Sequence, residues 1–130
     1  MGIRKLEHTG IMVRNMEESI TFYTEVIGMT LKDKFIHTDG IIGLAFLGFP
    51  EQDSVELELI QGYNDNLPAE GKVHHLAFTV DDIESEFERI QELQIELINP
   101  EIITLPNGSR YFFFKGPDGE HLELFQSTRP

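Results

Sequence analysis

Apolar and polar residues follow two different periods along this chain, and the order of these periods repeats. Runs with alternating apolar side chains predict strands, and apolar residues spaced three and four apart predict helices. A strand is expected to begin at His8 and another at His75, each leading through a polar turn into a helix. Six more strands are expected after the two helices, at residues 29–37, 41–49, 54–61, 96–104, 109–115 and 120–127.

Each predicted helix has one apolar face and a recognisable start. The two faces consist of Met16, Ile20, Tyr23 and Ile27 in the first helix and of Ile83, Phe87, Ile90 and Leu93 in the second. Asn15 is expected to cap the first helix, and Asp81 or Asp82 the second, because short polar side chains accept hydrogen bonds from the first free N–H groups. Gly28 is expected to end the first helix.

The two halves of the chain are copies of one pattern. His75 lies 67 residues after His8, and at the same offset apolar and acidic positions match: Val13 with Val80, Met16 with Ile83, Glu17 with Glu84, and Ile20 with Phe87. The order βαβββ therefore occurs twice, which predicts an α+β fold of two modules, 1–61 and 73–130, joined by a linker at 62–72. One module alone has too small a core, so two are expected to combine.

Composition limits the possible partners and the possible chemistry. The chain has 130 residues and a formal net charge of −13, so we expect no binding to nucleic acid or to an anionic membrane surface. It has no cysteine, so a metal would need nitrogen and oxygen ligands. No apolar run resembles a signal peptide or a membrane span, and a cytoplasmic location is expected.

The repeat selects four residues as candidate ligands. His75 matches His8, whereas the neighbouring His74 would face the other side of a strand. The last strands of the modules, SVELELIQ and GEHLELFQS, share the letters LEL, which aligns Glu58 with Glu123. A carboxylate between leucines is costly to bury unless it meets water or a cation. Packing two modules about a twofold axis would bring His8, Glu58, His75 and Glu123 together.

Two imidazoles and two carboxylates suit one divalent metal ion per site. Nickel or zinc is favoured, and cobalt, manganese or iron is possible. An octahedral ion with four protein ligands keeps two open positions, which could bind two adjacent substrate oxygens. The competing interpretation places both glutamates on an exposed acidic face and packs the histidines as ordinary strand residues. His37, His74 and His121 are expected to have no metal role, although His121 shares a face with Glu123.

Three segments resemble the vicinal oxygen chelate superfamily, namely LEHTGIMVRNMEESITFYTEVIGM, HHLAFTVDDIE and FFKGPDGEHLELFQ. This superfamily includes glyoxalase I, bleomycin-resistance proteins, extradiol dioxygenases, fosfomycin-resistance thiol transferases and methylmalonyl-CoA epimerase. The resemblance covers nearly the whole chain. It implies a single domain, 1–130, with open, curved mixed sheets. The ligand order His8, Glu58, His75, Glu123 is similar to that of short bacterial glyoxalase I.

The resemblance to glyoxalase I also implies an activity. It is the metal-dependent isomerisation of a hemithioacetal formed from a thiol and an α-ketoaldehyde such as methylglyoxal. Glu123 would act as the base with Glu58 as its counterpart, at the interface of a homodimer. Met12 stands where relatives that use glutathione have arginine, so glutathione is in doubt as the thiol. The alternatives are another metalloenzyme of the superfamily (an epimerase, thiol transferase or dioxygenase) or a metal-free, drug-binding resistance protein.

Overall fold

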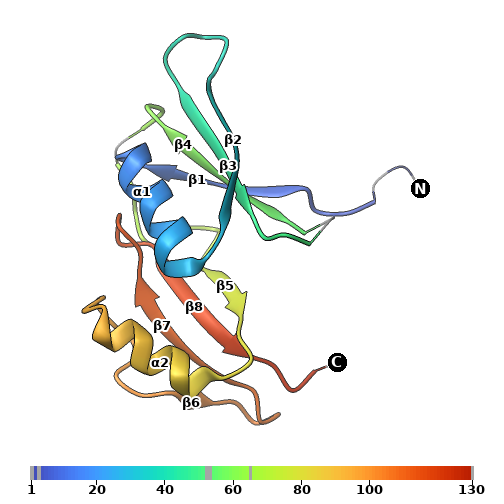
Figure 1. The fold of residues 1–130 in the computed structure, drawn as a ribbon, viewed down its shortest axis with the longest axis vertical. Coiled ribbons are helices and arrows are strands. Elements are labelled where there is room, and N and C mark those ends of the chain that lie inside the picture. The colour runs from blue at the N-terminus through green and yellow to red at the C-terminus, as the bar shows by residue number, and fades with distance from the viewer. Residues whose placement is uncertain (1, 3, 52–53, 65, 130) are drawn as a thin grey trace. The chain divides into compact units, whose positions relative to one another are not determined.

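The computed structural model describes residues 2, 4–51, 54–64 and 66–129. The chain divides into two compact units, Met1–Leu67 and Pro68–Pro130, and each is described here by itself (Figure 1). Residues 52–53, between the strands expected at 41–49 and 54–61, lie outside the described residues.

The first unit is one mixed sheet with one helical segment. Its strands lie in the order β1-β4-β3-β2; β1 and β4 are parallel, and the other neighbours are antiparallel. The elements are β1 (His8–Val13), α1 (Met16–Phe22), the π-helical turn η1 (Tyr23–Ile27), β2 (Thr30–Ile36), β3 (Gly43–Gly48) and β4 (Glu56–Gln61).

The second unit repeats this topology. Its strands lie in the order β5-β8-β7-β6, again with a parallel pair, β5 and β8, at one edge. The elements are β5 (Leu76–Thr79), α2 (Ile83–Glu92), β6 (Ile103–Thr104), β7 (Arg110–Lys115) and β8 (His121–Gln126). Two four-stranded mixed sheets with few helices confirm the predicted α+β class and the βαβββ order.

The helix ends follow the predicted chemistry. The Asn15 side chain accepts a hydrogen bond from the N–H of Glu18, and Asp82, rather than Asp81, accepts one from Ser85. Gly28 ends the first helical segment with φ of 93°, a left-handed conformation that favours glycine. Among the described residues, no helix has the length and apolarity needed to cross a lipid bilayer.

Three local expectations were wrong. The strand expected at 96–104 is interrupted, leaving an isolated bridge between Leu97 and Phe114 and the two-residue β6. The interruption occurs where the Asn99 side chain accepts the N–H of Phe113 and Pro100 has no N–H to donate. The second half of the first helix is the π-helical η1, at a point where the Thr24 hydroxyl donates to the carbonyl of Ile20. Leu93 follows the end of α2 and is 49% exposed rather than packed on the apolar face.

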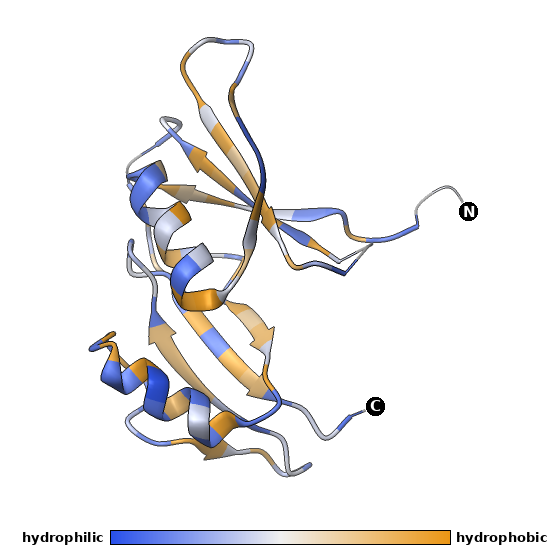
Figure 2. Cartoon of the chain, viewed as in Figure 1, coloured by the Kyte–Doolittle hydropathy of each residue, from blue (hydrophilic) through white to orange (hydrophobic). Residues whose placement is uncertain are grey.

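Each sheet buries one face beneath its own helical segment. The buried residues include Val13, Met16, Tyr23, Leu57 and Leu59 in the first unit and Ile83, Ile90, Phe112, Phe114, Leu122 and Leu124 in the second. Figure 2 shows that β7 is mostly apolar, that β8 alternates between apolar and polar segments, and that much of α2 is polar. Because side chains alternate along a strand, Glu58 and Glu123 lie on the sheet face opposite the flanking buried leucines.

A glutamine at the end of the last strand supports the helix start in each unit. The Gln61 side chain accepts a hydrogen bond from the N–H of Met16, and Gln126 accepts one from Ile83 at 2.8 Å. These N–H groups belong to the first residues of α1 and α2, which have no partner within their helices. The two contacts fix each helix to the strand that also carries a candidate glutamate.

Replacing Gln126 with alanine is expected to lower the free energy of unfolding by about 1–3 kcal/mol, because the N–H of the buried Ile83 loses its partner. Urea unfolding followed by circular dichroism measures this change. Gln91→Ala is the matched control. Gln91 is exposed on α2, the helix that begins at Ile83, and its replacement should change stability by less than about 0.5 kcal/mol. Equal effects of the two variants would contradict a role for Gln126 at the helix start.

Candidate metal centre

In the first unit, two neighbouring strands bring His8 and Glu58 together. His8 is the first residue of β1, and the parallel pairing of β1 with β4 places Gly10 opposite Glu58. The His8 Nε2 lies 3.5 Å from the Glu58 Oε1. A Cβ added at Gly10 would lie 3.1 Å from that same oxygen, so glycine leaves the space that the carboxylate occupies.

The second unit brings His75 and Glu123 together in the same way. His75 directly precedes β5, and Ala77 lies opposite Glu123 on the parallel strand β8. The His75 Nε2 lies 3.1 Å from the Glu123 Oε1. Each unit therefore places its candidate histidine beside its candidate glutamate. That the two pairs meet at one ion remains a prediction.

In each unit a phenylalanine ring packs against the imidazole of the His–Glu pair. The sequence analysis identified neither phenylalanine. Phe46 on β3 lies opposite Glu58, and Phe113 on β7 lies opposite Glu123. The His8 and Phe46 ring centroids are 5.7 Å apart with planes at 88°, and those of His75 and Phe113 are 4.9 Å apart at 85°. These edge-to-face contacts restrict the imidazoles. The signal was available, since Phe113 lies 67 residues after Phe46.

Neither glutamate lies on an exposed acidic face. The side chains of Glu58 and Glu123 are only 15% and 8% exposed. Burial raises the pKa of the Glu123 carboxyl above its usual value, and the nearby His75 opposes part of this rise. Glu123 is thus a buried carboxylate whose charge is costly in the absence of a cation.

The other nitrogen of each imidazole contacts the preceding residue. The His8 Nδ1 lies 2.6 Å from the Glu7 Oε1, and the His75 Nδ1 lies 2.9 Å from the His74 Nδ1. An imidazole that donates from Nδ1 presents the lone pair of Nε2, as metal-bound histidines generally do. In both units Nε2 faces a glutamate, so this donor set fits half of a divalent metal site.

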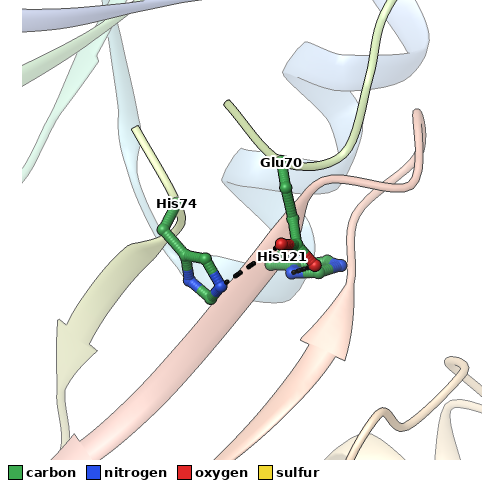
Figure 3. Close-up of side chains that lie close together, drawn as sticks. All are labelled: Glu70, His74 and His121. Carbon is green, nitrogen blue, oxygen red and sulfur yellow. Dashed lines mark ion pairs between the residues drawn. The ribbon is translucent and has the colours of Figure 1, made fainter. Parts of the chain in front are cut away.

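The remaining histidines differ in their surroundings. His37 lies between β2 and β3, with its Nδ1 3.8 Å from an Asp39 oxygen. His74 and His75 were expected on opposite sides of a strand, but both precede β5 and their rings are in contact, so strand alternation does not apply. His74 and His121, expected to have no metal role, lie close to Glu70 in a cluster that the sequence analysis missed (Figure 3).

Residues 5–124 match the family described as the Glyoxalase/Bleomycin resistance protein/Dioxygenase superfamily. The chain belongs to this superfamily. The match includes both His–Glu pairs and both helices. Membership in the superfamily confirms the family resemblance and agrees with the repeated βαβββ topology described above.

Several known proteins are similar to this chain over nearly its whole length. The "Uncharacterized protein YwbC" of Bacillus subtilis is 56% identical over 123 residues, covering 95% of this chain and 98% of that protein. A lactoylglutathione lyase of Neisseria meningitidis is 32% identical, covering 94% of this chain and 90% of that enzyme. Among solved structures, the trypanothione-dependent glyoxalase I of Leishmania major is 28% identical with a TM-score of 0.78, covering 95% of this chain and 87% of that one.

Proposed function

We propose that this protein is a metal-dependent, glyoxalase-like lyase that isomerises the hemithioacetal of a thiol and an α-ketoaldehyde such as methylglyoxal. The main support is the equivalent pairing of His8 with Glu58 and of His75 with Glu123 in the two units. Relatives named lactoylglutathione lyase provide the reaction class. Both glutamates lie on the sheet faces opposite the buried leucines that flank them.

The four side chains of the two pairs would hold one divalent ion, with nickel or zinc as the favoured metal. Packing of the two module types about an approximate twofold axis, within one chain or across a homodimer, would combine two nitrogens with two carboxylate oxygens. Such an ion, when bound, supplies a Lewis acid for two adjacent oxygens of the substrate. The contacts of His8 with Glu7 and of His75 with His74 would keep both Nε2 atoms oriented.

Glu123 is proposed as the base that moves the proton between the two adjacent carbons. Its carboxylate is buried, which excludes bulk water, and burial raises its pKa toward the range in which a carboxylate accepts a proton well. Accepting the proton at a Glu123 oxygen also removes a costly buried charge. Glu58, the equivalent residue in the first unit, is less buried and is proposed to act as its counterpart.

The thiol is left open within this proposal. The Neisseria relative is named for lactoylglutathione and the Leishmania enzyme for trypanothione, so related proteins differ in the thiol they use. Met12 on β1 replaces the arginine that the resemblance to glutathione-using enzymes implies. With a net charge of −13, the chain also offers few cations for a polyanionic thiol.

A second candidate function is the binding of an apolar small molecule without chemistry. It is favoured by a hollow of about 540 Å³ in the first unit, a volume typical of ligand pockets. Apolar side chains that are exposed in the structure contribute to its lining, namely Phe35, Ile36 and Ile41. These residues lie on β2 and beside β3, apart from the His8–Glu58 pair in the strand order.

The two candidates are separated by an assay on metal-loaded protein. Methylglyoxal is mixed with a panel of small thiols of different charge, glutathione included, and thioester formation is followed by absorbance. We expect turnover with at least one thiol, its loss after chelation and its return when nickel or zinc is added. Absence of turnover with every thiol, together with tight binding of an apolar compound by metal-free protein, would favour the second candidate instead.

A further inference from the structure

We propose that Glu70, His74 and His121 form a second metal site, located entirely in the second unit. One ligand atom from each of the three side chains lies within 4.8 Å of the other two (Figure 3). Two imidazoles and one carboxylate form the ligand set of many zinc sites that keep an open position. None of the three residues belongs to the four proposed above, so this inference goes beyond the proposed function.

The local chain path explains why these residues meet. Glu70 and His74 are four residues apart in the segment that leads into β5, and His121 is the first residue of β8. The parallel pairing of Leu76 with Leu122 places the start of β8 beside the residues just before β5. The three side chains therefore lie together at one end of the parallel strand pair. Of the three, His121 lies two residues before Glu123 on β8.

Glu70 lies close to both imidazoles without a direct hydrogen bond to either. One Glu70 oxygen lies 3.6 Å from the His74 Nε2, and the other lies 3.7 Å from the His121 Nδ1. Both separations exceed the usual hydrogen-bond range of about 2.7–3.2 Å. The two contacts use different Glu70 oxygens. One ligand atom from each residue lies within 4.8 Å of the others, compared with about 3.4 Å between two ligand atoms on a tetrahedral ion with bonds of about 2.1 Å. Small side-chain movements would complete the site.

The contact between His74 and His75 couples this cluster to the candidate centre. Their Nδ1 atoms are 2.9 Å apart, so only one of these two nitrogens can carry the hydrogen that lies between them. A metal on Nε2 of either ring requires that hydrogen on the Nδ1 of the same ring. While the contact persists, an ion on His74 therefore disfavours an ion on His75, and excess metal should compete with the four-residue site.

Zinc binding tests the site at Glu70, His74 and His121. The test uses a full-length variant in which His8→Ala and Glu58→Gln remove the His–Glu pair of the first unit. In this background we expect calorimetry to give one Zn²⁺ per chain. Adding Glu70→Gln or His121→Ala should weaken that binding by at least about tenfold, since even partners outside the ligand shell alter affinity by about 10–100-fold. The Glu70 side chain is 60% exposed, so its replacement by glutamine should leave the fold intact, as circular dichroism will verify.

Glu101→Gln is the matched control, because Glu101 is an exposed glutamate of the same unit outside the cluster. Added to the variant that carries His8→Ala and Glu58→Gln (the parent), Glu101→Gln should leave the zinc affinity unchanged. The inference is overturned if the parent binds no zinc, or if Glu70→Gln and His121→Ala bind zinc as tightly as Glu101→Gln does. Because zinc is measured without turnover, failure of this site and failure of the proposed activity are distinguishable.

Discussion

Glu123→Gln is expected to reduce turnover of the hemithioacetal by about 10²–10⁴-fold, the usual contribution of a general base. Glutamine keeps the shape of the side chain on β8 but cannot accept the proton. Glu123 is buried beside His75, and burial raises the pKa of its carboxyl, which favours proton acceptance. The measurement is thioester formation at saturating substrate with the metal content determined on the same samples.

The matched control for this prediction is Glu101→Gln, which removes an exposed carboxylate from the same unit and should turn over as the unmodified protein does. Metal content separates the two possible roles of Glu123. A variant that retains the ion but loses turnover has lost the base, whereas loss of both shows a role as ligand. Full turnover by metal-loaded Glu123→Gln would show that another residue is the base.

Phe112→Ala is expected to lower the free energy of unfolding by about 3–5 kcal/mol, because truncation of a buried aromatic residue leaves a cavity. Phe112 is fully buried on β7, with its ring 4.9 Å from that of Phe87 on α2 and 5.9 Å from that of Phe114. Urea unfolding followed by circular dichroism gives the change. The adjacent Phe113 points to the opposite face and pairs with Glu123, so the variant should also impair the candidate centre.

Tyr63→Ala provides the comparison for Phe112→Ala. Tyr63 is also aromatic but is 71% exposed, so its truncation should change the unfolding free energy by less than about 0.5 kcal/mol. A loss for Phe112→Ala as small as that for Tyr63→Ala would contradict the packing of α2 on β7.

Local signals allowed much of the fold to be predicted from the sequence. The cap at Asn15 and the left-handed Gly28 depend on nearby residues, and both were found where the residue types indicated. The strand at 96–104 was mispredicted because its apolar pattern did not reveal that the Asn99 side chain takes a hydrogen bond from β7. The π-helical η1 likewise arises from hydrogen bonding that apolar periodicity does not encode.

The candidate centre was partly predictable because the chain contains its pattern twice. The repeat selected His8 with His75 and aligned Glu58 with Glu123, and the structure pairs one histidine with one glutamate in each unit. Phe46 and Phe113 were missed because their role depends on cross-strand register.

The Glu70 cluster had no counterpart in the repeat. Glu70 and His121 are far apart in sequence and meet only through the parallel pairing of β5 with β8. His74 was set aside on the expectation of strand alternation, which fails because β5 begins two residues later. Tertiary contacts of this kind could not be inferred from spacing alone.

The central claim is that two half-sites, one from each module, hold a single metal ion. Anomalous diffraction from a crystal of the zinc-loaded protein tests it most directly. The account predicts a peak about 2.0–2.2 Å from a nitrogen of His8 and of His75 and from an oxygen of Glu58 and of Glu123. Zinc found only at Glu70, His74 and His121, or bound to one His–Glu pair without the other, would contradict it.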